Sequence, residues 1–234
     1  MMQKKLACNL AATLMLANAP TWAADPSDLY VNLTLSANQQ TIGDDQKVSP
    51  RQASLLTGAS DDNTSAASIS IGKKLGGNYR AELEYSLPRT AEFISYWTPF
   101  NANANVFQLK SQRLMLNGYK DFALSNQWSA NLMAGLGVAS VSAQGWQRIP
   151  ERSLYENTQT TLAFSLGAGV EYDISSDWKL GFGYRYTRLG NVESGVNSYT
   201  TAAFNSSTGV GVQDEMMRGK LSENSLFLSL RKDF

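Results

Sequence analysis

Two carboxylates, Glu82 and Glu84, have the spacing in this chain that could support catalysis. They stand two positions apart in an extended segment, so both side chains point to the same face, as general acid–base groups require. The chain contains no histidine and its only cysteine is Cys8, so the usual nucleophile–base pairs cannot be built. Arginines share the same face, which favours a structural ion network instead. We therefore expect no catalytic residues and no enzyme.

The other acidic residues do not have the spacing of a metal site. Asp44 and Asp45 are adjacent in a polar segment, and so are Asp61 and Asp62. Metal-binding loops space their oxygen ligands at wider, regular intervals. We interpret both pairs as solvated loop charges, and we expect neither a metal nor a cofactor.

The first residues have the composition of a secretory signal peptide. A basic region with Lys4 and Lys5 precedes an apolar stretch at 10–17, and Ala23 supplies the small residue at the cleavage position. Cleavage of residues 1–23 would leave 24–234 as one domain without cysteine, and hence without disulfides. Without the two lysines, the balance of 20 basic and 20 acidic residues becomes 18 and 20. This balance gives no reason to propose a nucleic-acid partner.

Apolar and polar residues alternate through most of the mature chain, most regularly at 162–173. A tilted strand of about ten residues can cross a membrane, and the alternation predicts eight such strands. Short turns alternate with long polar connections, which we place at about 38–65, 88–105, 144–157 and 190–221. The pattern predicts an all-β fold, an eight-stranded antiparallel up-and-down transmembrane β-barrel with four long extracellular loops.

The two faces of the predicted strands differ in the way that a membrane barrel requires. A soluble barrel such as a lipocalin places its apolar residues around an internal cavity. Here one face carries Leu, Phe and Tyr, whereas the other carries Gly, Ser and charged residues. Because buried charges must be paired, we expect both signs to cross-link the lumen and close it to ions, together with Met133 and Phe227. The predicted lumen charges are Arg80, Glu82, Glu84, Glu171, Arg185 and Arg231.

One predicted strand, from about 106 to 122, has no clear parity. Phe107 and Leu109 indicate one apolar face, whereas Leu114 and Leu116 indicate the other. A β-bulge places two residues opposite one and shifts the alternation by one residue. We predict a bulge near 111–113.

Aromatic residues occur in two kinds of place. Trp128 and Trp178 each begin a strand after a short turn, Tyr79 occupies the equivalent place, and all three fit a periplasmic girdle. A second group falls in the predicted loop 88–105. It is either a further part of an interfacial girdle or an exposed patch that contacts a partner. Its members are Phe93, Tyr96, Trp97 and Phe100.

The chain ends in a strand whose terminal residue is aromatic. The segment resembles the carboxy-terminal assembly signal of bacterial outer-membrane barrels, and this resemblance implies the barrel assembly machinery as a partner. Lys232 departs from that signal, which often has Tyr there. The residues that carry the signal are Leu226, Leu228, Leu230 and Phe234.

Several segments resemble the opacity-type and OmpX-like small barrels, described as the outer membrane protein beta-barrel domain. They are 114–122 (LMLNGYKDF), 132–138 (LMAGLGV), 166–172 (LGAGVEY), 180–186 (LGFGYRY) and 228–234 (LSLRKDF). The resemblance implies the outer membrane of a Gram-negative bacterium, with outer-membrane lipid and lipopolysaccharide as surroundings. It also implies a surface protein, often an adhesin, with a host-cell or matrix receptor. We expect adhesion or another surface interaction; the alternatives are a barrel that stabilises the membrane and a porin-like channel for small solutes.

Overall fold

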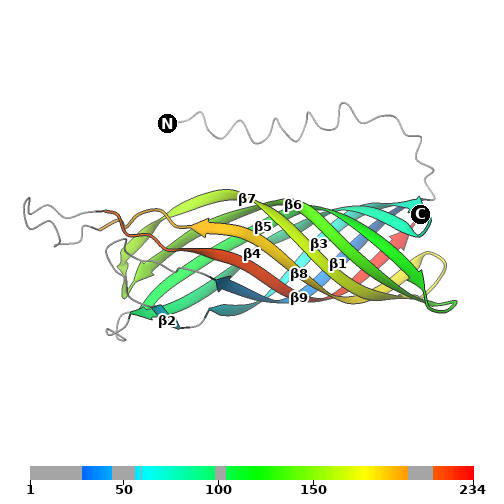
Figure 1. Cartoon of the computed structure of the whole chain (residues 1–234), viewed down its shortest axis with the longest axis horizontal. Coiled ribbons are helices and arrows are strands. Elements are labelled where there is room, and N and C mark those ends of the chain that lie inside the picture. Colours follow the sequence, from blue (N-terminus) through cyan, green and yellow to red (C-terminus); the bar gives the residue numbers. More distant parts are fainter. Residues whose placement is uncertain (1–27, 44–55, 59, 98–103, 200–212) are drawn as a thin grey trace, which may run out of the picture.

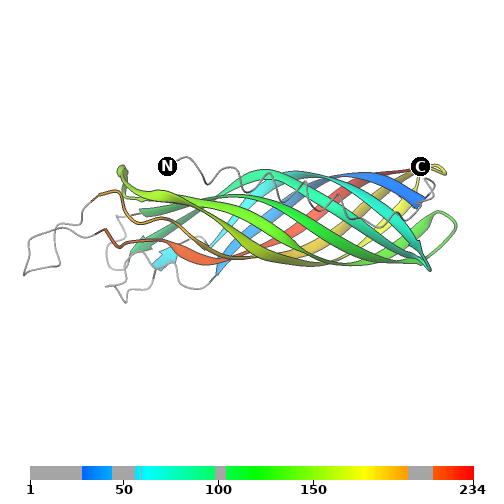
Figure 2. The same cartoon turned by 90° about the horizontal axis from the view of Figure 1, so that it is seen from above.

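One antiparallel sheet closes on itself to form an elongated barrel (Figures 1 and 2). The computed structural model describes residues 28–43, 56–58, 60–97, 104–199 and 213–234. Eight long strands form the barrel wall, and the three-residue β2 pairs with the end of β4. The strands are β1 (Leu29–Gly43), β2 (Leu56–Gly58), β3 (Asp61–Gly76), β4 (Tyr79–Trp97), β5 (Ala104–Ala123), β6 (Trp128–Gln147), β7 (Ile149–Asp173), β8 (Trp178–Glu193) and β9 (Arg218–Asp233).

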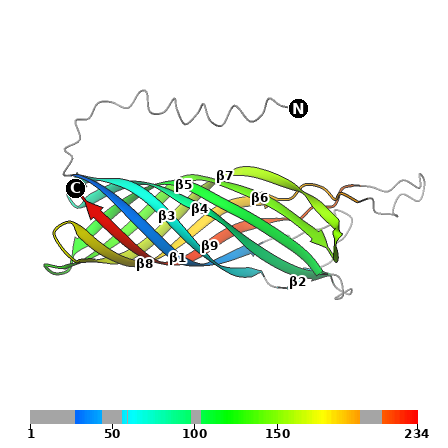
Figure 3. The same cartoon turned by 180° about the vertical axis from the view of Figure 1, so that it is seen from behind.

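The barrel closes where its first strand meets its last. β1 pairs with β9 along its whole length, and β1 lies between β3 and β9 in Figure 3. The amide of Phe234 adds a hydrogen bond of 3.1 Å to the carbonyl oxygen of Leu29. Pairing of β4 with β5 completes the ring. The prediction of an eight-stranded antiparallel barrel is confirmed.

Short turns and the C-terminus lie together at one end of the barrel (Figure 1), which we call the short-turn end; the other is the long-loop end. Between β3 and β4, Gly77 and Asn78 adopt positive φ angles of 59° and 63°, which both residue types accept. The turns before β6 and β8 are capped alike, because the Oγ atoms of Ser125 and Ser175 accept hydrogen bonds of 3.2 Å from the amides three residues on. These turns fix the strand register at this end.

The strands are longer than predicted and include parts of the segments that the sequence indicated as loops. Most of the segment 88–105 belongs to β4 and β5, and within 144–157 only Arg148 separates β6 from β7. The predicted loops 38–65 and 190–221 are shortened at both ends in the same way. The physical reason is that the outer face of each strand contacts lipid near the short-turn end and water near the long-loop end.

An outward apolar band covers the half of the barrel nearer the short-turn end. Large apolar side chains stay exposed there on every wall strand, over a length that suits the hydrocarbon layer of a bilayer. The polar face of the same strands points inward. The band includes Leu33 and Leu35 (β1), Ile69 and Ile71 (β3), Leu83 and Tyr85 (β4), Leu114 and Leu116 (β5), Leu132 and Leu136 (β6), Leu162, Phe164 and Leu166 (β7), Leu180, Phe182 and Tyr184 (β8), and Leu226, Leu228 and Leu230 (β9).

Beyond this band the polarity of the two faces reverses. On β5, Leu114 and Leu116 point outward within the band, but further along Phe107 and Leu109 are buried inside while Lys110 is exposed. Water therefore replaces lipid as the outer solvent, and the interior becomes an apolar core. The reversal explains why the alternation of this strand looked broken.

The bulge predicted near 111–113 is wrong. β5 pairs with β6 without interruption, so its residues alternate regularly throughout. The register shift lies in the neighbouring strand, between Ser86 and Arg89 of β4, which pair with Arg113 and Ser111. Two residues of β4 there stand opposite one of β5, which is a bulge in β4.

Gly137 illustrates how closely the inward face is packed. A Cβ atom at this position would lie 2.1 Å from the carbonyl oxygen of Leu114 and 2.8 Å from the Cα of Met115. We expect Gly137→Ala to lower the free energy of unfolding by about 1–3 kcal/mol, measured by urea titration in lipid vesicles. At the outward-facing Gly118 a Cβ meets nothing nearer than 3.9 Å. Equal losses for Gly118→Ala and Gly137→Ala would contradict this account.

Candidate functional site

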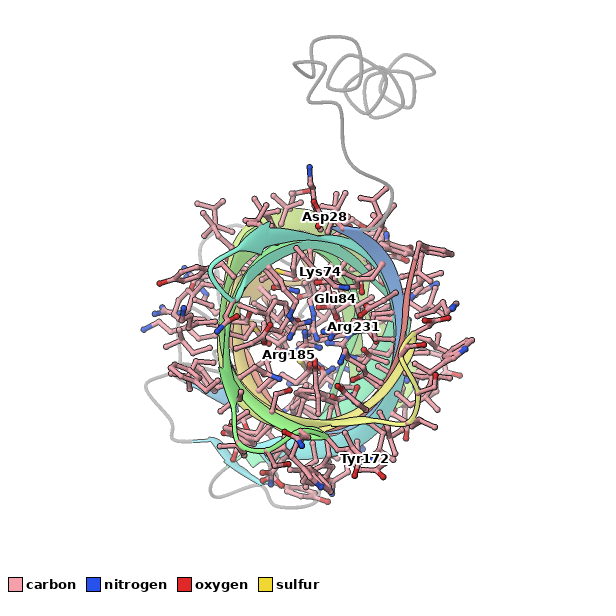
Figure 4. All side chains as sticks on the ribbon, turned by 90° about the vertical axis from the view of Figure 1, so that its right-hand side faces the viewer. Asp28, Lys74, Glu84, Tyr172, Arg185 and Arg231 are labelled. Carbon is pink, nitrogen blue, oxygen red and sulfur yellow. The ribbon has the colours of Figure 1, made fainter. Side chains whose placement is uncertain are left out.

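The lumen near the short-turn end holds a network of ion pairs. The Arg80 guanidinium donates to both carboxylate oxygens of Asp121, at 2.7 and 2.8 Å, and to Glu171 at 3.0 Å. Arg231 reaches Glu171 at 3.0 Å from the other side, and Lys74 pairs with Asp233 at 2.9 Å. In the view along the barrel axis, Lys74 and Arg231 lie within the ring of strands (Figure 4).

The middle of the lumen is crossed by a two-point ion pair. Arg185 donates to the two oxygens of Glu84 at 2.6 and 3.1 Å, and the Asn117 amide donates to Glu84 at 2.8 Å. Glu82 accepts a hydrogen bond of 3.2 Å from Tyr119. The open space beside these groups is about 20 Å³, roughly enough for one water molecule. Figure 4 shows Glu84 and Arg185 converging inside the ring.

This arrangement does not favour catalysis by the two glutamates. Glu82 and Glu84 are 2% and 3% exposed, and Glu84 is committed to Arg185 and Asn117. A substrate would need an access path that the surrounding side chains occupy. Among the described residues, no three potential metal ligands gather into a group.

A third layer of charge surrounds Glu223, which the sequence interpretation did not single out. Its carboxylate is fully buried and accepts hydrogen bonds from Arg89, from Arg113 at 2.7 Å and from Gln40 at 3.1 Å. Ser225 donates a further bond of 3.1 Å. One buried carboxylate thus holds two arginines from neighbouring strands β4 and β5.

Beside this layer and beyond it toward the long-loop end lies an apolar cluster, which we call the upper cluster; its Met115 reaches back to the level of Glu84, opposite which it stands on β5. Phe93, predicted to belong either to an interfacial girdle or to an exposed contact patch, is fully buried within this cluster, so it cannot contact a partner. Most of the cluster fills the barrel where the outside is polar, as in a soluble β-barrel. It comprises Ile42, Ala91, Phe93, Phe107, Leu109, Met115, Ala139, Val141, Ala143, Leu154, Ala163, Leu189, Val192, Met217 and Leu221.

The outer surface of the long-loop end carries a braced hairpin, the tip of β6 and β7. Arg148 turns the chain there with a φ of 65°. Ile149 and Tyr155 are 44% and 56% exposed, although the wall around them faces water. The backbone of Tyr155 pairs with segment 195–196 through bonds of 2.9 and 2.7 Å. Large exposed apolar side chains on a rigid element are typical of a contact surface.

Tyr199 ties this hairpin to the segment just before β9. Its hydroxyl donates a hydrogen bond of 2.8 Å to Glu215 and lies 3.1 Å from the side-chain oxygen of Gln147, and the Arg152 guanidinium lies 4.6 Å from its ring centroid. Burial, and then the hydrogen bond and charge of Glu215, raise the pKa of Tyr199. The phenol therefore stays protonated and keeps its role as donor.

Two other residues of the predicted aromatic group, Tyr96 and Trp97, belong to β4. Tyr96 is 38% exposed near the end of β4, and Trp97 is the last residue of that strand. Phe100 lies outside the described residues, as does the predicted signal peptide 1–23. Of the described side chains, Phe93 is buried inside the barrel and Tyr96 is exposed, so these two do not share one surface.

The terminal strand presents its apolar residues outward. Leu226, Leu228, Leu230 and Phe234 are all exposed on the lipid-facing side. Lys232 pairs with Asp177 at 2.9 Å, and its Nζ lies 5.5 Å from the ring centroid of Trp178. The Ser176 hydroxyl and then Lys232 lower the pKa of Asp177. Trp128, Trp178 and Tyr79 are likewise exposed at the start of their strands.

Comparison with known structures agrees with this architecture. Neisserial surface protein A has 15% sequence identity and a TM-score of 0.52, and the match covers 88% of this chain and 97% of that one. The outer membrane protein OprG from Pseudomonas aeruginosa has 10% sequence identity and a TM-score of 0.53, and the match covers 88% of this chain and 98% of that one. At this level of identity the likeness shows the shared fold alone.

Sequence comparison supplies the family. No curated protein sequence matches the chain significantly. No helix within the described ranges is long and apolar enough to span a membrane. A family model, however, matches residues 10–213, which is most of the chain. The protein therefore belongs to the family of the outer membrane protein beta-barrel domain.

Proposed function

We propose that this outer-membrane barrel is a surface-interaction protein of the adhesin type, whose closed barrel carries a rigid extracellular contact surface. The observation that supports the proposal most is the reversal of polarity along the strands. It makes the extracellular half a self-supporting wall with its own core. A binding surface on such a wall loses little conformational entropy when a partner docks.

The state of the lumen argues against the channel alternative. Ion pairs cross it at the levels of Glu171, Glu84 and Glu223, and the upper cluster fills it beyond them. Eight strands enclose a space that side chains alone can fill. A role in stabilising the membrane would need only the lipid-facing band, and it would leave the exposed Ile149 and Tyr155 unexplained.

The contact surface that we propose is the braced tip of β6 and β7. Arg148, Ile149 and Tyr155 combine a cation with apolar and aromatic area, the composition that dominates binding energy at interfaces. A host-cell or matrix protein with an acidic and apolar patch fits this chemistry.

The test is attachment of a non-adherent Gram-negative strain that displays the protein. We expect wild type to raise attachment to epithelial cells or immobilised matrix protein, and Arg148→Ser/Ile149→Ser/Tyr155→Ser to remove about nine-tenths of that gain. The matched control is Gln108→Ser/Lys110→Ser/Gln144→Ser, on the polar wall away from the tip. Attachment no higher than that of the empty strain, with wild type folded at the surface, would refute the proposed function. A full gain by the tip variant would place the contact elsewhere.

A further inference from the structure

A small cavity lies in the lumen beside the ion pair of Glu84 with Arg185, which converge inside the ring of strands (Figure 4). Its volume is about 20 Å³, and Arg80 and Glu82 also line it. A cavity needs roughly 10–15 Å³ of such space to hold one water molecule. This cavity therefore has room for one water molecule and for no larger ligand.

Three polar atoms of the lining residues are buried without a hydrogen-bond partner in the described part of the chain. They are Oε2 of Glu82, Nε of Arg185 and Oδ1 of Asn32. Glu82 and Arg185 are only 2% and 4% exposed, so bulk water does not solvate them. Native structures pair nearly all such buried groups, either with protein or with an ordered water molecule. The three atoms therefore require a partner at the cavity.

The neighbouring polar groups are already directed to other atoms. Both terminal nitrogens of Arg185 donate to Glu84, at 2.6 and 3.1 Å, which leaves the Nε–H of this arginine. Tyr119 donates to Oε1 of Glu82 at 3.2 Å, which leaves Oε2 of this carboxylate. Arg80 donates to two other carboxylates at 2.7 to 3.0 Å. The partner of the three atoms is therefore a group that the side chains around the cavity do not supply.

A water molecule is the chemical complement of these three atoms. Its oxygen accepts one hydrogen bond from the Nε–H of Arg185, and its two hydrogens are donated to Oε2 of Glu82 and Oδ1 of Asn32. Three hydrogen bonds are the usual number for a buried water molecule. A cation would suit the two oxygens, but the guanidinium groups of Arg80 and Arg185 line the same small cavity and would repel it.

We infer that the lumen binds one ordered water molecule at this site, held by Glu82, Asn32 and Arg185. The water links the two carboxylates of β4 to one guanidinium, because Arg185 then holds Glu84 directly and Glu82 through the water. Asn32 becomes a positioning residue of the lumen network, a role that its alternation in the sequence does not reveal. The site is independent of the contact surface at the β6–β7 tip.

The experiment is high-resolution crystallography of the full protein, combined with urea titration in lipid vesicles. We expect wild type to show a density peak within hydrogen-bond distance of the three atoms. Asn32→Leu replaces the amide by an apolar group of similar size and should remove the peak. It should also raise the equilibrium constant for unfolding about fivefold, because the bonded water is lost. The matched control Asn38→Leu changes a buried asparagine on the same strand and face that does not line this cavity, and it should keep the peak.

A dry cavity would give the opposite results. Wild type would then show no peak, and Asn32→Leu would be as stable as wild type or more stable, because it removes an acceptor that had no partner. Either result overturns the inference, as does a peak that persists in Asn32→Leu or disappears in Asn38→Leu. Crystals soaked in rubidium chloride test for a cation, since an anomalous peak at the site would replace the water by a metal ion. If Asn32→Leu does not fold, the wild-type density alone decides.

Discussion

Glu223→Gln should lower the free energy of unfolding by about 3–5 kcal/mol, because it leaves buried charges without their partner. The wild-type carboxylate is fully buried and pairs with both Arg89 and Arg113, which are themselves buried. Glutamine has nearly the same shape, so the loss reports charge and not a cavity. Urea titration of protein refolded in lipid vesicles measures it.

Two further variants make this result specific. Lys232→Gln removes the exposed pair with Asp177, and we expect it to cost far less because water solvates the remaining charge. Replacing Arg89 and Arg113 by methionine in the Glu223→Gln background removes the stranded charges and should recover most of the stability. A loss for Glu223→Gln no larger than that for Lys232→Gln would mean that the buried layer is not held by charge.

The second large effect is expected on the lipid-facing side. Leu166 points outward near the middle of the β7 row 162–172, between Phe164 and Ala168. Leu166→Arg should cost about 2–4 kcal/mol if the site lies near the bilayer midplane, since a cation there is taken out of water. The same urea titration in vesicles measures this loss.

Thr160 supplies the matched control on the same strand and the same face. It is exposed, but it lies beyond the apolar band, where the outer solvent is water. Thr160→Arg should therefore leave stability nearly unchanged. Equal costs at Thr160 and Leu166 would show that the boundary of the membrane does not lie between them.

The sequence was sufficient for the membrane-spanning half of the fold. Alternation at 162–173 reflects a constant pair of solvents, lipid outside and a polar lumen inside, so parity alone assigned the faces. Parity could not assign the faces in the long-loop half of the strands. There the outer solvent is water, so the apolar residues face the interior and not the outside. Phe107 and Leu109 then resembled a slipped strand, and Phe93 resembled a loop residue.

The same change of solvent hid part of the lumen network. Arg80, Glu84 and Arg185 were recognisable as interior charges because they alternate with large apolar residues along their strands. Arg89 and Glu223 stand at the level where the alternation reverses, so neither parity class marked them as interior. The sequence did contain a signal for this level. A charged residue whose face carries polar residues in one direction along the strand and apolar residues in the other marks the transition from the lipid-facing to the water-facing half.

The upper cluster also gives the closed lumen a dependence on temperature. Its apolar side chains are held together by the hydrophobic effect, which is almost entirely entropic near about 25 °C and weakens on cooling. The cost of stripping water from the paired charges below also grows as the temperature falls, because hydration of charged groups becomes more favourable. The apolar cluster and the ion pairs therefore both become weaker on cooling. Water is excluded from the interior of this barrel most strongly at higher temperature.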